Sequence, residues 1–453
     1  MDPHVGIPAV RHPRWRMRFS ERTGWNAEES ELARAHRLRR QAGLPIADLT
    51  ASNPTRCGFT YPSSLLQALA DKRALDYDPQ PLGLRAAREA VCAYYADHGV
   101  RLDPGQLVLT TSTSEAYSFL FRLLCDAGDE IVIFQPGYPL FDFLADFDDV
   151  RLRAAPLVYE NGWQIDAEGL RRTVTDRTRA IVVVHPNNPT GHFTKAREKE
   201  ELGRICRERG LSLIVDEVFL DYANTGNRQQ GTGNRKAGAE QTREQVSQET
   251  GTEGPRDQGT EKTASDDTAS FAAGLEGVPV FVVSGLSKIA GLPQMKAAWI
   301  AATAPEREQA PNQPAIARLE IIADTFLSMN APVQWAMPAW LAGRSVIQDQ
   351  IRRRVAANLA ELDRQLAGLP AVQRLAMEGG WYAVLRIPAL QPDERTSLEL
   401  LERGVWVHPG YFFGLPESGW LVVSLLGIET EVSSGLANLI DYFRTNHTGN
   451  MTG

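Results

Sequence analysis

The sequence predicts an α/β fold in which a large three-layer αβα domain contains a mostly parallel sheet and is accompanied by a smaller α+β domain. Short apolar segments alternate with amphipathic helical patterns through residues 107–301. These segments are apolar at nearly every position, which is typical of strands covered on both faces. Beyond residue 314 the pattern changes to two long helices followed by short strands and further helices.

The N-terminal part contains two helical patterns. Residues 26–43 form the first, in which Asn26 can cap the helix, Glu29 has capping-box spacing and Gly43 ends it. The second pattern covers residues 84–98 and follows a loop rich in proline.

The large sheet is predicted from six apolar segments, each with the length of a buried strand. They are residues 107–110, 130–134, 180–184, 211–215, 278–283 and 298–301. Ligands of such sheets gather at the carboxyl ends of the strands. The residues that follow these segments are therefore the first candidates for a functional site.

Residues 224–271 interrupt this alternation. They are rich in Gly, Gln, Thr, Glu, Asn and Arg and contain few aliphatic residues, so they cannot bury enough apolar surface to offset the entropy of ordering them. We therefore expect a disordered insertion within a large domain that covers residues 50–310. Residues 1–49 and 311–453 are expected to form the small domain, with helices at 315–326 and 348–367 and from 394 and 432, and strands at 381–387, 405–408 and 421–425.

The composition argues against nucleic acid, membranes and metal. A net charge of −8 gives no general attraction to nucleic acid or anionic lipid. No apolar run approaches the length of a membrane span or of a signal peptide, so a cytoplasmic protein is expected. The four cysteines have no paired spacing, which argues against a disulfide or zinc framework.

Lys288 is the candidate residue from which the functional prediction starts. It follows the apolar segment 278–283, with Ser287 beside it and Lys296 eight residues later. A buried ammonium group is unfavourable, so a lysine at the end of a buried strand is usually paired, neutralised or used covalently. A lysine that extends from a loop into solvent is the alternative interpretation.

Further strand ends carry groups that suit a flat, phosphorylated ligand. Ser112, Thr113 and Ser114 open a helix, where free N–H groups can bind a phosphate, although an ordinary helix cap explains the same residues. Tyr138 lies in a turn from which its ring can cover a ligand. Asn188 lies in a turn that can direct its amide toward the same place, and turn formation alone would also explain its sequence.

Asp216 follows the segment 211–215, where a carboxylate requires a nearby cation or hydrogen-bond donors. The complete set is a phosphate-binding helix start, an aromatic ring, an amide, an acid and a lysine. These are the requirements of pyridoxal phosphate, which needs a lysine for the covalent bond to its aldehyde and an acid that keeps its ring nitrogen protonated.

On these residues the chain resembles the class I/II aminotransferases of the fold-type I pyridoxal-phosphate enzymes. The resemblance extends over residues 49–425 apart from the insertion, and its most specific parts are Asn-Asn188-Pro-Thr-Gly, Asp216-Glu-Val-Phe and Ser287-Lys288. It implies transfer of an amino group from an amino acid to a 2-oxo acid. It also implies that Lys288 binds the cofactor and moves the proton between substrate Cα and cofactor C4′.

The resemblance assigns roles to the other candidates as well. Asp216 is expected to pair with the ring nitrogen, Asn188 to hydrogen-bond the ring hydroxyl, and Tyr138 to stack on the ring. Tyr77 resembles a tyrosine that reaches the phosphate of the neighbouring subunit, which implies a homodimer with shared sites. The implied phosphate-binding residues are Ser112, Thr113, Ser114, Ser287 and Lys296.

Two departures from the family pattern concern the cofactor. Lys296 stands where the family usually has an arginine, so it keeps the charge but lacks the bidentate fork. Phe219 stands where a tyrosine commonly donates to the ring oxygen, and Tyr222 is one candidate for a substitute donor.

The third departure concerns the substrate. Val422 stands where the family usually has the arginine that binds the substrate α-carboxylate. Either another basic residue binds that group, with Arg386 and Arg56 as candidates, or the substrate lacks an ordinary α-carboxylate. Both arginines could equally form surface salt bridges.

Two other functions share this pattern. A lyase on the same fold, eliminating at sulfur or cyclising, would use the same cofactor site. A ligand sensor like the aminotransferase-like parts of some transcription regulators is disfavoured by Lys288 and by the roughly 50 residues before the fold, too few for a winged-helix domain. The sequence does not identify the amino donor.

Overall fold

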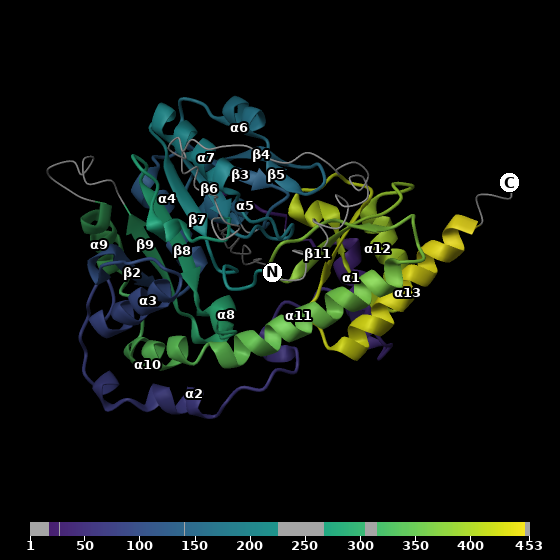
Figure 1. Ribbon diagram of the computed structural model, residues 1–453, viewed down its shortest axis with the longest axis horizontal. Helices are drawn as coiled ribbons and strands as arrows, with labels where there is room; N and C mark the ends of the chain where they lie inside the picture. Colours follow the sequence, from purple (N-terminus) through teal and green to yellow (C-terminus); the bar gives the residue numbers. More distant parts are fainter. Residues whose placement is uncertain (1–17, 27, 140, 225–266, 304–314, 449–453) are drawn as a thin grey trace, which may run out of the picture.

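The computed structural model of the chain describes residues 18–26, 28–139, 141–224, 267–303 and 315–448. Two parts of different size lie side by side, and the long helix α11 (Ser345–Leu366) runs along both of them (Figure 1). Most of the predicted insertion, residues 225–266, and the predicted domain boundary near residue 310 lie outside the described residues.

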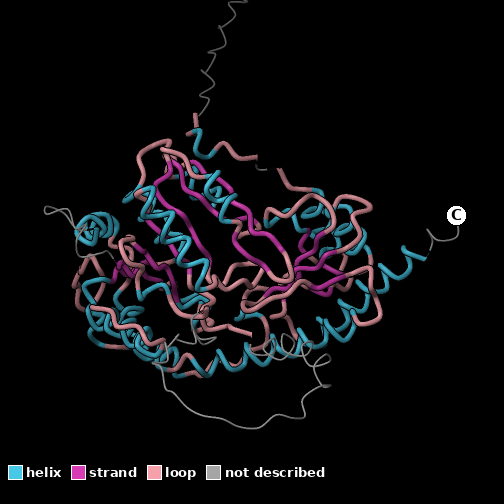
Figure 2. The backbone as a smooth tube through the Cα atoms, turned by 45° about the horizontal axis from the view of Figure 1, so that its top comes forward, coloured by secondary structure: helices cyan, strands magenta, loops and turns pink. Residues whose placement is uncertain are grey.

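The large part is built on an eight-stranded sheet, which Figure 2 shows between layers of helices. Five neighbouring strands, β8 (Val280–Gly285), β7 (Ser212–Asp216), β6 (Thr178–Val184), β3 (Glu130–Gln135) and β4 (Arg151–Tyr159), are parallel to one another. Strand β9 (Ala298–Thr303) runs antiparallel to both its neighbours, and β5 (Trp163–Ile165) runs antiparallel to β4. The α/β prediction with a mostly parallel sheet is therefore confirmed. In spatial order the strands are β2 (Leu107–Thr110), β9 (Ala298–Thr303), β8 (Val280–Gly285), β7 (Ser212–Asp216), β6 (Thr178–Val184), β3 (Glu130–Gln135), β4 (Arg151–Tyr159) and β5 (Trp163–Ile165).

Two of these strands, β4 and β5, were not predicted. Arg151, Arg153 and Pro156 interrupt the apolar pattern of β4, because this strand lies toward the sheet edge and exposes part of its length. The rule that selected uniformly apolar segments finds strands covered on both faces and misses those covered on one.

Helices cover both faces of the sheet and create two separate apolar cores. One core joins strand residues such as Val108 and Ile131 to α4, α5 and α9, and the other joins residues such as Leu109 and Val132 to α3, α7 and α10. The helices of this part are α2 (Ser64–Gln67), α3 (Arg85–Asp97), α4 (Thr113–Leu124), α5 (Phe141–Phe147), α6 (Ala167–Thr173), α7 (Ala196–Arg209), α8 (Leu286–Ile289), α9 (Ala315–Phe326) and α10 (Ala331–Ala342).

The smaller part contains an antiparallel sheet in the order β10 (Gln373–Arg374), β11 (Tyr382–Arg386), β14 (Trp420–Ser424) and β13 (His408–Pro409). An N-terminal strand, β1 (Ala47–Asp48), pairs with β12 (Val405–Trp406), so the segment before residue 50 lies with the C-terminal part. The helices here are α1 (Glu31–Gln41), α12 (Asp393–Glu402) and α13 (Glu429–Thr448).

The boundaries of several helices differ from the prediction. The first helix begins at Glu31 and not at Asn26, because Ser30 is its cap and accepts a hydrogen bond from the Ala33 amide, whereas Asn26 accepts only from the Glu28 amide in a local turn. Helix α10 was not predicted. It packs on α3, and α9 packs on α4, so both lie with the large sheet although they follow residue 311.

Within the described residues, no helix has the length and apolar character required to cross a membrane. No group of three or more His, Cys, Asp or Glu side chains in the same part of the chain is arranged to hold a metal ion.

Candidate active site

Lys288 lies in the short helix α8, directly after β8 at the carboxyl end of the parallel strands. Its amine is surrounded by aromatic rings, with Nζ 5.0 Å from the ring centroid of Trp381 and 5.7 Å from that of Phe219. Burial lowers the pKa of Lys288 to about 8, and the nearby Asp216 opposes that shift. The amine is therefore neutral in a much larger fraction of molecules than an exposed lysine.

Asp216 is the last residue of β7, which lies between β6 and β8. Its carboxylate accepts hydrogen bonds from the Tyr117 hydroxyl and from the Val218 amide, each at 3.0 Å. Burial raises the pKa of Asp216 to about 6, while these two donors and Lys288 favour the charged form. A cation placed against Asp216 would keep it ionised at neutral pH.

The raised pKa gives a prediction for stability. Because the pKa of Asp216 rises from 3.8 to about 6 on folding, the folded protein favours the protonated acid, and stability is lost as the pH rises between these values. Without any ligand, Asp216→Asn is therefore expected to be more stable than wild type at pH 8, by about 2–3 kcal/mol. Urea unfolding at pH 8 and pH 4 measures this difference, which should vanish at pH 4; an equal difference at both values would contradict it.

Asn188 lies in the turn that follows β6. The turn is fixed by Asn187, whose side chain accepts from the Thr190 hydroxyl at 2.9 Å, and by Gly191, which has a φ of 71°. A side chain at position 191 would meet the Gly379 carbonyl oxygen at 2.4 Å, so glycine is required there. Asn188 is 8% exposed, and its Oδ1 atom has no hydrogen-bond partner among the described residues.

The start of α4 supports both interpretations of its serine and threonine residues. Ser112 is the helix cap, and its Oγ accepts from the Glu115 amide at 3.1 Å. The Glu115 carboxylate in turn accepts from the Thr111 amide at 2.7 Å. Thr113 and Ser114 form the first helical turn, in which N–H groups have no carbonyl partner within the helix. Capping thus orders the same backbone that could bind a phosphate.

The other predicted cofactor residues occupy more open positions. Tyr138 lies in the loop between β3 and α5 and is 45% exposed, and burial together with Asp216 raises the pKa of its hydroxyl. Ser287 is half-buried beside Lys288. Lys296 is exposed and has a φ of 51° directly after a short 3-10 helix.

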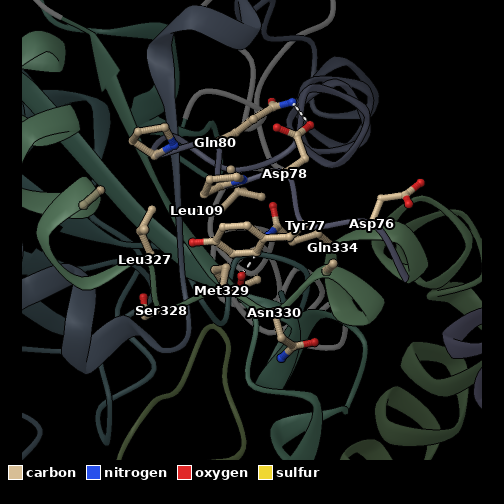
Figure 3. A pocket seen from close by; sticks show the side chains of 15 residues that line it. Asp76, Tyr77, Asp78, Gln80, Leu109, Leu327, Ser328, Met329, Asn330 and Gln334 are labelled. Atoms are coloured by element: carbon tan, nitrogen blue, oxygen red, sulfur yellow. Dashed lines mark hydrogen bonds between the residues drawn. The ribbon is translucent and has the colours of Figure 1, made fainter. Parts of the chain in front are cut away.

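Tyr77 projects from the chain and is 83% exposed. It lies across a cavity of about 260 Å³ between the loop at residues 76–83 and the segment 327–331 (Figure 3). Ser328 in the second segment donates to the Glu115 carboxylate at 2.9 Å, so this cavity is joined to the start of α4 by one hydrogen bond.

Comparison with known proteins identifies the family. The pattern of the family described as aminotransferase class I and II matches residues 61–437. The chain belongs to this family. The aspartate/prephenate aminotransferase of Thermus thermophilus is 27% identical over 390 residues, covering 84% of this chain and 87% of the relative. A shorter match to nicotianamine aminotransferase 1 of Oryza sativa, 32% identical, covers 34% of this chain and 32% of the relative.

Solved structures agree in fold. An alanine aminotransferase from Pyrococcus furiosus has a TM-score of 0.78 and 22% sequence identity, covering 94% of this chain and 100% of that one. The protein is therefore an aminotransferase, as the sequence predicted, and its family uses pyridoxal phosphate.

Of the two arginines predicted to bind the substrate, Arg386 lies away from this site and Arg56 lies nearer to it. The start of β11 faces the site, because Tyr382 lies close enough to Tyr138 for their hydroxyls to interact electrostatically. Arg386 ends the same strand, about 13 Å away along an extended chain, where its guanidinium covers the Trp420 ring at 4.9 Å. Arg56 is exposed in a 3-10 helix, directly before Cys57, which also lies near Tyr382.

The position of the missing family arginine is closed. Val422 is fully buried in β14, where it pairs with Val384 on one side and His408 on the other. Among the described residues, no contact between Val422 and Lys288 is found. A valine has no charge and no hydrogen-bond donor, so this side chain offers no partner for a carboxylate.

Three further residues of this aminotransferase were missed or misjudged from the sequence. Tyr117, which donates to Asp216, lies within an ordinary helical pattern, and Trp381, which covers Lys288, is the first residue of a predicted strand; neither has a sequence signal beyond its aromatic ring. Tyr222 was considered as a substitute for the hydroxyl missing at Phe219. Its hydroxyl instead donates to the Lys288 carbonyl oxygen at 2.7 Å.

Proposed function

We propose that this aminotransferase binds pyridoxal 5'-phosphate at the carboxyl ends of β6, β7 and β8, with Lys288 as the residue that bonds the cofactor covalently. The observation that supports this most strongly is the placement of Asp216 and Lys288 at the carboxyl ends of the neighbouring strands β7 and β8. Asp216 is in register with Val283 of the neighbouring strand, five residues before Lys288. Asp216 is buried and Lys288 is partly buried, and each influences the pKa of the other.

The other groups present fit the same cofactor. The buried Asn188 amide has an unpartnered oxygen, so its side chain has hydrogen-bonding capacity left for the ring hydroxyl. The first turn of α4 offers N–H groups for a phosphate, with Ser287 and Lys296 as additional donors. Tyr138 is exposed enough to cover a ring. When bound, pyridoxal phosphate supplies an electron-withdrawing ring that stabilises negative charge at the substrate carbon.

The chain's own groups then have separable tasks. Asp216 holds positive charge on the ring nitrogen, because its two protein donors leave the carboxylate poised for a cation. Lys288 holds or removes a proton at the substrate carbon, for which a pKa of about 8 is suitable at neutral pH. The rings of Trp381 and Phe219 lie over this amine and reduce its contact with water. The expected substrates are an amino acid donor and a 2-oxo acid acceptor.

Arg56 is proposed as the ligand of the donor carboxylate, and Arg386 serves as its matched control. Arg56→Ala is expected to raise the KM for the donor about tenfold or more, because a charge-assisted hydrogen bond is lost. Arg386→Ala should leave KM unchanged, since this residue lies at the far end of β11. Initial rates with varied donor concentration measure both effects. Unchanged KM in Arg56→Ala would show that the carboxylate is bound elsewhere or absent from the substrate.

We also propose that the protein forms a homodimer in which Tyr77 reaches the site of the partner. Leu327, which lines the Tyr77 cavity (Figure 3), is 41% exposed, and Leu75, next to the lining residue Asp76 in the chain, is 88% exposed; a second copy of the chain would cover both. Such an isologous interface places one Tyr77 at each of two equivalent sites.

Subunit mixing tests this arrangement. Lys288→Ala and Tyr77→Ala subunits are unfolded together and refolded, which gives hybrids with one intact site if Tyr77 acts across the interface. About one quarter of wild-type activity is then expected from a random mixture. Activity no greater than the average of the two parents would show that Tyr77 acts within its own subunit or outside the site.

The proposed function as a whole is tested by adding pyridoxal phosphate to the purified protein and then a panel of amino donors with 2-oxo acid acceptors. A visible absorption band from the bound cofactor and transfer of the amino group are expected. The absence of such a band in wild type would overturn the cofactor assignment.

A further inference from the structure

The turn that carries Lys288 is held by side chains from three separate segments. Tyr222 donates to the Lys288 carbonyl oxygen at 2.7 Å, Gln348 to the Ile289 carbonyl oxygen at 2.8 Å, and Tyr61 to the Gly291 carbonyl oxygen at 2.7 Å. Helix α8 has only four residues. Within this helix the Lys288 carbonyl oxygen also accepts from the Gly291 amide at 3.2 Å, so Tyr222 and Gln348 add side-chain donors at Lys288 and Ile289, and Tyr61 adds one at Gly291, just after the helix.

Tyr222 contacts both the backbone of Lys288 and the aromatic rings near its amine. Its hydroxyl binds the backbone of Lys288, and its ring packs edge to face against Trp381 at 5.1 Å and near Phe219 at 6.5 Å between centroids. Those two rings are the ones that surround Nζ. A displacement of Tyr222 would therefore move the lysine backbone and loosen the aromatic surroundings of the amine together.

Burial makes these contacts persistent. Tyr222 is 4% exposed and Gln348 is 3% exposed. Burial raises the pKa of the Tyr222 hydroxyl well above its ordinary value, so it remains a donor across the physiological range.

Gln348 also links the lysine turn to the smaller part of the molecule. It lies on α11, whose residue Asn358 donates to the carbonyl oxygens of Leu425 and Gly427 at 2.8 and 2.9 Å. One rigid helix thus contacts the lysine turn near its N-terminal end and the end of β14 farther along.

We propose that Tyr222 is a positioning residue for Lys288, with Gln348 as a second support, and that together they keep the amine beside the rings of Trp381 and Phe219. The inference rests on the proposed function, which explains why the position and protonation of this amine matter. No contact of Tyr222 with substrate or cofactor is required.

The reactivity of the amine tests this proposal directly. Cofactor-free protein is treated with formaldehyde and cyanoborohydride across a pH series, and methylation of Lys288 is quantified by mass spectrometry. In wild type the pH at which methylation of Lys288 is half-maximal is expected near 8, the pKa of this amine. In Tyr222→Phe, water entering beside Nζ should raise the midpoint; a rise of one unit lowers methylation at pH 8 about fivefold.

Two further variants separate positioning from general stability. Tyr159→Phe is the matched control, because the Tyr159 hydroxyl also binds a backbone group, the Ala376 amide at 3.0 Å, but away from this site. It should lower Tm and leave the methylation profile unchanged. Gln348→Met should shift the profile in the same direction as Tyr222→Phe, and it supplies the test if Tyr222→Phe does not fold.

With a donor that the enzyme accepts, the positioning variants should lower kcat and leave KM near the wild-type value. Methylation profiles of Tyr222→Phe and Gln348→Met that match the Tyr159→Phe control would overturn the proposal. Because methylation requires no cofactor, this outcome is distinct from failure of the proposed function, which would appear as a wild-type protein without a visible band in pyridoxal phosphate.

Discussion

Lys288→Ala is expected to abolish the visible band of the bound cofactor and to lower kcat by about 10⁴-fold or more, since both the covalent attachment and the proton-transfer group are lost. The structure gives the physical basis, because no other described lysine has its amine surrounded by Trp381 and Phe219. Absorption spectra and initial rates at saturating substrate measure the two effects.

Lys288→Arg is the control for charge. It retains a cation near Asp216 but cannot form the covalent bond, so it should lose the band as completely as Lys288→Ala does. Retention of a normal band in either variant would place the covalent bond on another residue.

Asp216→Ala is expected to lower kcat by about 10²–10³-fold and to weaken cofactor binding, because the positive charge on the ring nitrogen loses its buried partner. The Tyr117 hydroxyl and the Val218 amide, which now donate to the carboxylate, would also lose their acceptor. Rates at saturating cofactor and a cofactor titration separate the two consequences.

Asp393→Asn is the matched control for this change. Asp393 is also a buried carboxylate whose pKa burial raises to about 6, but it lies in the smaller part and accepts from the Gly419 and Trp420 amides. Its replacement should alter stability without altering cofactor affinity. Equal losses of affinity in both variants would indicate that Asp216 acts through stability alone.

The asparagine variant of Asp216 adds an expectation that links stability to function. The unliganded protein holds a buried acid whose pKa is raised to about 6 and a buried amine whose pKa is lowered to about 8. Both pKa shifts arise because burial disfavours the carboxylate of Asp216 and the ammonium of Lys288, and a bound ligand of opposite charge would offset this cost. Increased stability of Asp216→Asn at pH 8 together with loss of activity would show that the site is organised for a cation and not for stability of the fold.

The sequence was most informative for the buried strands and for the reactive residues at their ends. The strands at residues 107–110 and 130–134 are apolar at all but one position each because both sheet faces are covered, and their boundaries match the structure closely. The positions of Lys288 and Asp216 follow from the same pattern, since Asp216 ends β7 and Lys288 lies in the short helix that follows β8.

Other features depend on contacts that no local pattern contains. Strand β4 alternates exposed and buried residues and contains Pro156, so its sequence resembles a loop. Tyr117 and Trp381 belong to the site only because the fold brings α4 and the start of β11 beside the lysine. The role of Tyr222 could not be predicted, because its acceptor is a backbone carbonyl 66 residues away in the chain.

The central claim, that Lys288 and its neighbours perform amino transfer on bound pyridoxal phosphate, is tested most directly by a half-reaction. Cofactor-loaded protein is mixed with one amino donor and no acceptor, and the spectrum and the released oxo acid are measured together. The structure and the family predict loss of the original band and release of one oxo acid per site, followed by recovery of the band when a 2-oxo acid is added. Continuous release of oxo acid and ammonia with the band unchanged would contradict amino transfer and indicate a lyase.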